Sequence, residues 1–349
     1  MTTAEKRKEA RDISLVFHAA LVAYGLDTIA DSLTLYDDVQ PTPSSINSSG
    51  GRWLSRALDL LSGRRRAARD LAFTYYQLHR ALHTGYAIPL PGYPATGRQS
   101  LAALRERFFS QVEQMAPGVL GSDRGLVDQD GVKVTTAPPD YDESIPVDSP
   151  AEDLDGIIEE LDDFAEQEAR SELTNVGLNN LDKMLGAIKT DAPAQEVDQA
   201  REAAHQQTSA RQAATSEGVV LDGARDNLVA VGTRDQRIIG FARVSGTGSP
   251  CGWCAMLISR GAVYRSYRTG GGSKAGARET DTTFHRNCKC YAEPIYSTEQ
   301  YDEDDRFDLN RKLSELWPQV IGNARGKAAV SVWRRYIRRH PLTTDRVSA

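Results

Sequence analysis

The sequence predicts a mainly α-helical, multi-helical protein with a small α+β, zinc-knuckle-like module of cysteine and histidine near the C-terminus. Apolar residues recur at three- and four-residue steps over most of the chain, which is the spacing of amphipathic helices. Short β-rich runs occur only in residues 258–296, and all four cysteines lie between residues 251 and 290.

The composition is typical of a folded soluble protein, with 40% hydrophobic and 26% charged residues among 349. A formal charge of −6 argues against a protein that coats nucleic acid with its whole surface, although local basic patches can still bind it. The first residues lack the apolar segment of a secretory signal. We also find no run of about eighteen apolar residues, so we expect no membrane contact.

Residues 1–115 are predicted to form a helical N-terminal domain. Residues 4–35 have the pattern of one long amphipathic helix, with Ile13, Phe17 and Leu21 on its apolar face. Glycine and proline in the polar stretch 41–51 indicate a loop. A second long helix is expected over about 53–83, and a shorter one over 100–115.

Residues 116–150 are rich in glycine, proline and aspartate and are predicted to be a linker or arm. Residues 151–245 form a helical region, with helices expected at 150–170, 173–188, 193–216 and 219–228. Within the module, residues 246–300, short β-runs are expected at 262–264 and 291–295. Two further helices, around 309–320 and 328–339, belong to a C-terminal helical tail, residues 301–349.

The cysteine module offers five soft donors for a metal ion. Cys251 and Cys254 form a Cys-x-x-Cys turn, whose two thiolates can face one point, and His285, Cys288 and Cys290 lie across a glycine-rich loop. Zn²⁺ prefers four such ligands in a tetrahedron, and structural zinc is therefore the favoured interpretation. The single residue between Cys288 and Cys290 makes joint binding by both awkward, so Cys251, Cys254, His285 and Cys290 are the preferred four.

Two other interpretations of these residues stay open. The thiols can form paired disulfides or remain reduced without metal. Disulfides persist outside the cell, whereas a cytosolic chain holds them poorly. A catalytic Cys–His pair is the third interpretation, although it does not explain four cysteines. No residue is assigned a catalytic role from the sequence.

Two basic clusters are candidates for contact with DNA phosphates or an acidic partner. The first comprises Arg64, Arg65 and Arg66 in the second helix, and the second comprises Arg334, Arg335 and Arg338 in the last one. A solvated helix face is the simpler explanation of the first cluster, and a surface helix with one apolar face explains the second equally well.

The motifs resemble those of the Mu F-like (MuF) minor head proteins of tailed phages. The resemblance is carried by Cys-Gly-Trp-Cys at 251–254, Phe-His-Arg-Asn-Cys-Lys-Cys at 284–290 and Pro294. Residues 69–83 are similar to an N-terminal helix of the actinobacteriophage members, which are often labelled capsid maturation protease. Arg286 and Lys289 depart from the commonest form of the signature, but neither change removes a ligand.

The resemblance implies a structural morphogenesis protein inside the procapsid near the portal. Its partners would be the portal, scaffold and major capsid proteins, and it would move from the host cytoplasm during assembly to the interior of the virion head. The alternative is a capsid maturation protease that cuts capsid or scaffold protein. Ser249 or Cys251 with His285 can be named for such an enzyme, and Glu279 or Glu293 for a metal-dependent version. A DNA-binding accessory protein is a third hypothesis.

Overall fold

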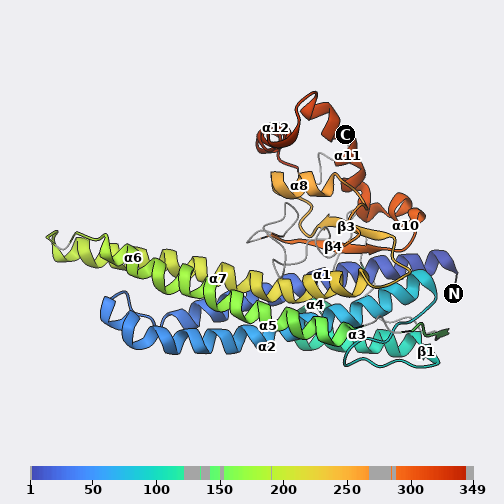
Figure 1. The fold of residues 1–349 in the computed structure, drawn as a ribbon, viewed down its shortest axis with the longest axis horizontal. Helices are drawn as coiled ribbons and strands as arrows, with labels where there is room; N and C mark the ends of the chain where they lie inside the picture. Colours follow the sequence, from blue (N-terminus) through green and yellow to red (C-terminus); the bar gives the residue numbers. More distant parts are fainter. Residues whose placement is uncertain are drawn as a thin grey trace.

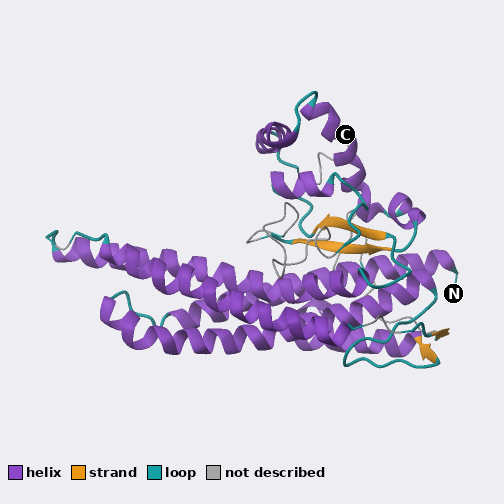
Figure 2. Cartoon of the chain, viewed as in Figure 1, coloured by secondary structure: helices purple, strands orange, loops and turns teal. Residues whose placement is uncertain are grey.

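The computed structural model describes residues 2–121, 134, 142–149, 153–189, 191–266, 284 and 288–342. These residues are mainly helical, with a small two-stranded sheet and a cysteine cluster near the C-terminus, as the sequence predicts. Long helices lie side by side in an elongated bundle, and a smaller unit stands on one side of it (Figure 1). The two strands of the C-terminal sheet lie between that bundle and the C-terminal helices (Figure 2).

Three long helices make the centre of the bundle: α1 (Thr3–Tyr36), α2 (Pro43–Thr84) and α7 (Ala194–Gly232). Each packs against the other two. They share one hydrophobic core with α3 and α5, because each helix turns an apolar stripe toward its neighbours. Large side chains fully buried in this core include Phe17, Tyr36, Trp53, Phe73, Tyr75, Tyr76 and Phe108.

The start of α2 differs from the expectation. Residues 41–51 were predicted to be a loop, but the helix begins at Pro43, about ten residues early. The hydroxyl of Thr42 accepts a hydrogen bond from the amide of Ser45, and proline fits the first helical position because it needs no amide hydrogen there. The other long helix of the N-terminal part, α1, matches the prediction within one residue at either end.

Shorter elements cover the bundle. Strands β1 (Arg98–Ser100) and β2 (Ser144–Pro146) pair in antiparallel register, with Gln99 opposite Ile145. The expected helices at 100–115 and 150–170 are confirmed as α3 and α5, and residues 174–179 form one wider turn between α5 and α6. The helices around the bundle are α3 (Leu101–Met115), α4 (Pro117–Gly121), α5 (Leu154–Leu173), η1 (Thr174–Asn179) and α6 (Asn180–Gly186).

The C-terminal unit is built on strands β3 (Gly240–Ser245) and β4 (Cys290–Ile295), which pair in antiparallel register. The run expected at 291–295 is confirmed as β4, whereas 262–264 supplies only a bridge from Tyr264 to Phe241. Strand β3 was not foreseen. The helices of this unit are α8 (Gly252–Ile258), α10 (Thr298–Glu303), η2 (Asp305–Phe307), α11 (Asp308–Ile321) and α12 (Gly326–Arg339).

Helix α1 is long and apolar enough to cross a membrane by length and composition, the one such helix among the described residues. The sequence analysis did not identify this segment, and the expectation of no membrane contact stays a prediction. Half of its most apolar window is buried inside the protein. It packs on α2 and α7, and it carries buried polar residues such as Asp12 and Ser14, so its place in the core accounts for its composition.

We expect Gly223→Ala to destabilise the protein, because α7 approaches the backbone of α2 closely at this residue. A Cβ at Gly223 would lie 2.6 Å from the carbonyl oxygen of Arg65. Overpacking of this kind costs about 1–3 kcal/mol, measurable by urea denaturation. Gly218→Ala on the same helix is the control, since nothing lies within 4 Å of its Cβ. It should gain up to about 1 kcal/mol in helix propensity; equal shifts in both variants would contradict the close approach.

Candidate metal centre

Two elements bring the cysteines together. Cys251 is the N-cap of α8, and its sulfur accepts a hydrogen bond at 3.4 Å from the amide of Cys254, three residues on. Cys290 is the first residue of β4, and Cys288 precedes it by two positions. Residues two apart in extended chain point to the same side, so both sulfurs can face one centre.

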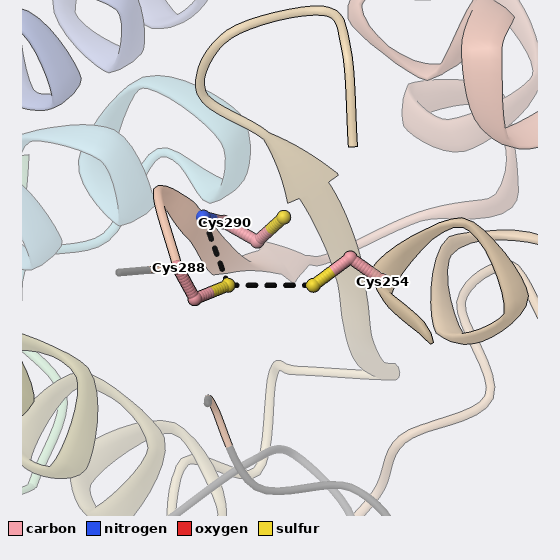
Figure 3. Close-up of side chains that lie close together, drawn as sticks. All are labelled: Cys254, Cys288 and Cys290. Carbon is pink, nitrogen blue, oxygen red and sulfur yellow. Dashed lines mark hydrogen bonds between the residues drawn. The ribbon is translucent and has the colours of Figure 1, made fainter. Parts of the chain in front are cut away.

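Three sulfurs form a compact buried cluster, which we call the thiol cluster: Cys254, Cys288 and Cys290. Their sulfur atoms all lie within 4.8 Å of one another, and the three residues are 0%, 4% and 4% exposed. The sulfurs of Cys254 and Cys288 are 3.4 Å apart, and the amide of Cys290 donates to the sulfur of Cys288 at 3.4 Å (Figure 3). These three residues could hold a metal ion.

The sulfur separation argues against one of the chemical states proposed from the sequence, a disulfide between Cys254 and Cys288, but it fits both reduced thiols and metal ligands. A disulfide requires about 2.05 Å between sulfurs, and all four cysteines are free thiols here. Thiolates around tetrahedral zinc, each about 2.3 Å from the ion, are about 3.8 Å apart. The 3.4 Å between Cys254 and Cys288 is therefore close to the spacing of shared metal ligands and far from that of a bond.

The thiols hold their protons unequally. Hydrogen bonds with the thiols of Cys251, Cys288 and Cys290 raise the pKa of Cys254. Hydrogen bonds from Cys254 and Cys290, together with the charge of Arg225, lower the pKa of Cys288. The cluster thus favours one thiolate, and a thiolate is the form that binds metal.

Arg225 of α7 fixes the chain around the cluster. Its guanidinium donates to the carbonyl oxygens of Cys288 and Cys290, the second at 3.0 Å. It also lies 4.3 Å from the ring of Phe284, while Arg243 of β3 lies 3.8 Å from the same ring. The bundle helix therefore holds the backbone that presents the sulfurs.

The structure groups the predicted donors differently from the preferred four. Cys288, one of the five donors but not among the preferred four, belongs to the thiol cluster, because the i, i+2 spacing aligns its sulfur with that of Cys290. Cys251 is exposed and lies outside the group of three, although its thiol contacts that of Cys254. His285 lies outside the described residues, so the fourth position stays a choice between it and Cys251.

Glu293 is not positioned for metal chemistry at the thiols. It lies three residues after Cys290 on β4, and alternation along a strand sends its side chain to the opposite face. There the carboxylate is 0% exposed and accepts hydrogen bonds from Arg306 at 2.6 Å and from Ser14 and Tyr75 at 2.9 Å each. Glu279, the other acid considered, lies outside the described residues.

This Glu293 network was missed by the sequence analysis. Nε2 of His79 on α2 lies 3.1 Å from the carboxylate, so α1, α2 and η2 all converge on one residue of β4. Burial alone would raise the pKa of Glu293, but the charges of Arg306 and His79 outweigh it and hold the pKa well below its ordinary value. A lone glutamate inside the apolar run Tyr-Ala-Glu-Pro-Ile is the signal that could have indicated it.

The two arginine clusters have different surroundings. Arg65 is buried and lies 3.0 Å from Asp226, and Arg64 pairs with Asp31 at 2.5 Å, so both are neutralised within the chain. Arg66 is exposed. Arg334, Arg335 and Arg338 are all exposed on α12.

Residues 182–317 match the model of a protein family described as VG15 protein. The match indicates a phage or viral family. No curated protein and no solved structure matches the chain.

The matched stretch runs from α6 into α11 and contains the four cysteines, Arg225 and Glu293. The part of the chain that is similar to VG15 protein therefore includes the whole thiol cluster and the bundle helix that supports it. Helices α1, α2 and α12 lie outside the match.

Proposed function

We propose that this chain is a minor head protein of a phage, incorporated into the procapsid near the portal. The match of residues 182–317 to VG15 protein carries the proposal, because it indicates a phage family and encloses the cysteine module. The resemblance of 251–254 and 284–290 to the Mu F-like signature supports the narrower role. Portal, scaffold and major capsid proteins are the proposed partners, and the head interior is the proposed final location.

The thiol cluster would be a zinc-held staple of this protein. Cys254, Cys288 and Cys290 would supply three ligands, and Cys251 or His285 the fourth. Soft thiolates in this number select zinc over hard cations. Because the cluster joins α8 to β4 across about thirty intervening residues, a bound ion would fix both ends of that segment and contribute its binding free energy to folding.

A structural role agrees with the burial of the cluster better than catalysis does. A catalytic thiol must reach its substrate, whereas these three residues are at most 4% exposed. Cys251 and Ser249 are exposed, and His285, the histidine named with them for a protease, lies outside the described residues. The protease therefore stays the alternative to the structural role.

The test is co-expression with the phage's major capsid, portal and scaffold proteins. We expect the chain to co-purify with procapsids and the capsid protein to keep its full intact mass. Cys254→Ser should abolish incorporation because the module loses its staple, while the matched Ser249→Ala variant is incorporated normally. Procapsids without the wild-type chain would refute the proposal. Capsid protein trimmed with wild type but not with Cys251→Ser or His285→Ala would establish the protease instead.

A further inference from the structure

The C-terminal helices carry a concentrated positive charge on an acidic chain. Residues 309–342 contain eight basic side chains and one acidic one, a formal charge of +7, although the whole chain has −6. Helix α12 alone has five cations and no carboxylate, namely Lys327, Arg334, Arg335, Arg338 and Arg339.

The cations of α12 lie on one face. Ala329, Trp333 and Ile337 form the buried face, which packs on α8 and α11, with the rings of Trp333 and Trp317 5.0 Å apart. At 100° per residue, all five cations fall on the opposite side of the helix, and all five are exposed. We call this surface the cationic face.

The cationic face differs from the other arginine-rich parts of the protein. In the bundle, the buried arginines meet carboxylates: Arg80 lies 2.5 Å from Asp235, and Arg105 lies 2.5 Å from Glu9. Among the described residues, none of the five cations of α12 forms an ion pair. Arg338 donates instead to the carbonyl oxygen of Arg334, and Arg334 lies over the ring of Trp253.

We propose that the cationic face of α12 binds the phosphate backbone of duplex DNA without sequence preference. Clustered like charges repel one another, and an external polyanion removes that cost. From Lys327 to Arg339 the helix rises about 18 Å, a length over which a duplex carries about ten phosphate charges. Five cations facing such an array would displace condensed counterions, which is the main source of sequence-independent affinity.

An acidic protein segment is the competing ligand, and the surface favours the duplex over it. Protein interfaces need apolar anchors at their centre. The large hydrophobic side chains that stand exposed in the described chain are Leu26, Leu33, Ile239 and Val263, none of them on α11 or α12. The apolar side of α12 is already used against α8 and α11, and its exposed side chains are the five cations with Ala328 and Ser331. This proposal does not depend on the function proposed above.

The experiment is a salt titration of the full chain with a fluorescent 20-base-pair duplex of random sequence. For wild type, log Kobs should fall with log salt with a slope of about −4.5. Replacing Arg334, Arg335, Arg338 and Arg339 by glutamine should bring the slope to about −1 and weaken binding at least about 100-fold at about 50 mM salt. The same four residues changed to lysine should keep the slope.

The control removes the same charge from the bundle. Arg52, Arg56, Arg170 and Arg211 are exposed on α2, α5 and α7, and their replacement by glutamine should leave the slope and affinity nearly unchanged. Circular dichroism melts verify that both variants are folded. Absence of binding by wild type at low salt, or an equal loss in both variants, would overturn the proposal. So would tighter binding of the cationic face to poly-aspartate or to phosphatidylserine vesicles than to the duplex.

Discussion

Cys254→Ser is expected to strip the protein of zinc and to unfold the C-terminal unit while the helical bundle stays folded. Structural zinc in small finger peptides contributes about 10–16 kcal/mol of apparent binding free energy to folding at neutral pH. The thiol cluster lies in a hydrophobic cluster built from α8, α11 and α12 and separate from the core of the bundle. Loss of the ion should therefore affect the two parts of the protein unequally.

The tryptophan residues of the protein can report separately on the C-terminal unit and on the bundle. Trp253, Trp317 and Trp333 pack in the hydrophobic cluster of the cysteines, whereas Trp53 lies in the bundle core. Tryptophan emission should shift to the red in Cys254→Ser, or after treatment of wild type with a chelator, while most of the far-ultraviolet helix signal stays. Zinc per chain is measured by mass spectrometry of the metal.

Matched variants identify the fourth ligand. Of Cys251→Ser and His285→Ala, the one that loses zinc marks the ligand, and the other should retain it. Ser249→Ala, two residues before Cys251, is the neutral control. The zinc proposal would be contradicted if Cys254→Ser still bound zinc. It would also be contradicted if the wild-type protein carried no zinc after purification without chelators.

The helices could be predicted because their signal is local. The apolar stripe of α1 repeats every three or four residues within a single segment, so its bounds came out within one residue. The first ten residues of α2 lack such a stripe, since Ser44, Ser45, Ser48, Ser49 and Gly50 dominate there. Gly50 is buried where Leu178 packs, a contact between residues too distant in the chain to be seen in its pattern.

The sequence identified the candidate ligands of the cysteine site, but it did not show which of their sulfur atoms lie together. The spacing of Cys251, Cys254, Cys288 and Cys290 identified candidate ligands without any fold. Which sulfurs converge depends on extended chain at Cys288–Cys290 and on β3, whose pairing with β4 spans about fifty residues. The Glu293 network was beyond reach for the same reason, since two of its hydrogen-bonding partners, Ser14 and Tyr75, come from helices more than two hundred residues away in the chain.

Glu293→Ala is expected to cost about 3–5 kcal/mol of stability, the usual effect of removing one partner of a buried charge pair. The substitution would leave Arg306 buried with Asp304 as its remaining carboxylate, 2.6 Å away. Ser14 and Tyr75 would lose their shared acceptor and keep only the 2.9 Å hydrogen bond between their own hydroxyls. Urea denaturation followed by circular dichroism measures the loss. Glu315→Ala, at an exposed glutamate of α11, is the control and should change the free energy of unfolding by less than about 0.5 kcal/mol.

The contribution of the Glu293 carboxylate to stability should depend on pH. Because the folded protein holds the pKa of Glu293 well below its ordinary value, its charge stabilises the fold above the pKa of the unfolded chain, about 4.3. That contribution is lost as pH falls from there toward the lower folded value. Glu293→Gln keeps the shape but cannot titrate, so wild type should exceed it in stability at neutral pH, and the difference should shrink below about pH 4. A difference that is constant from pH 7 to 3 would mean that the interaction of Glu293 with Arg306 does not depend on its charge.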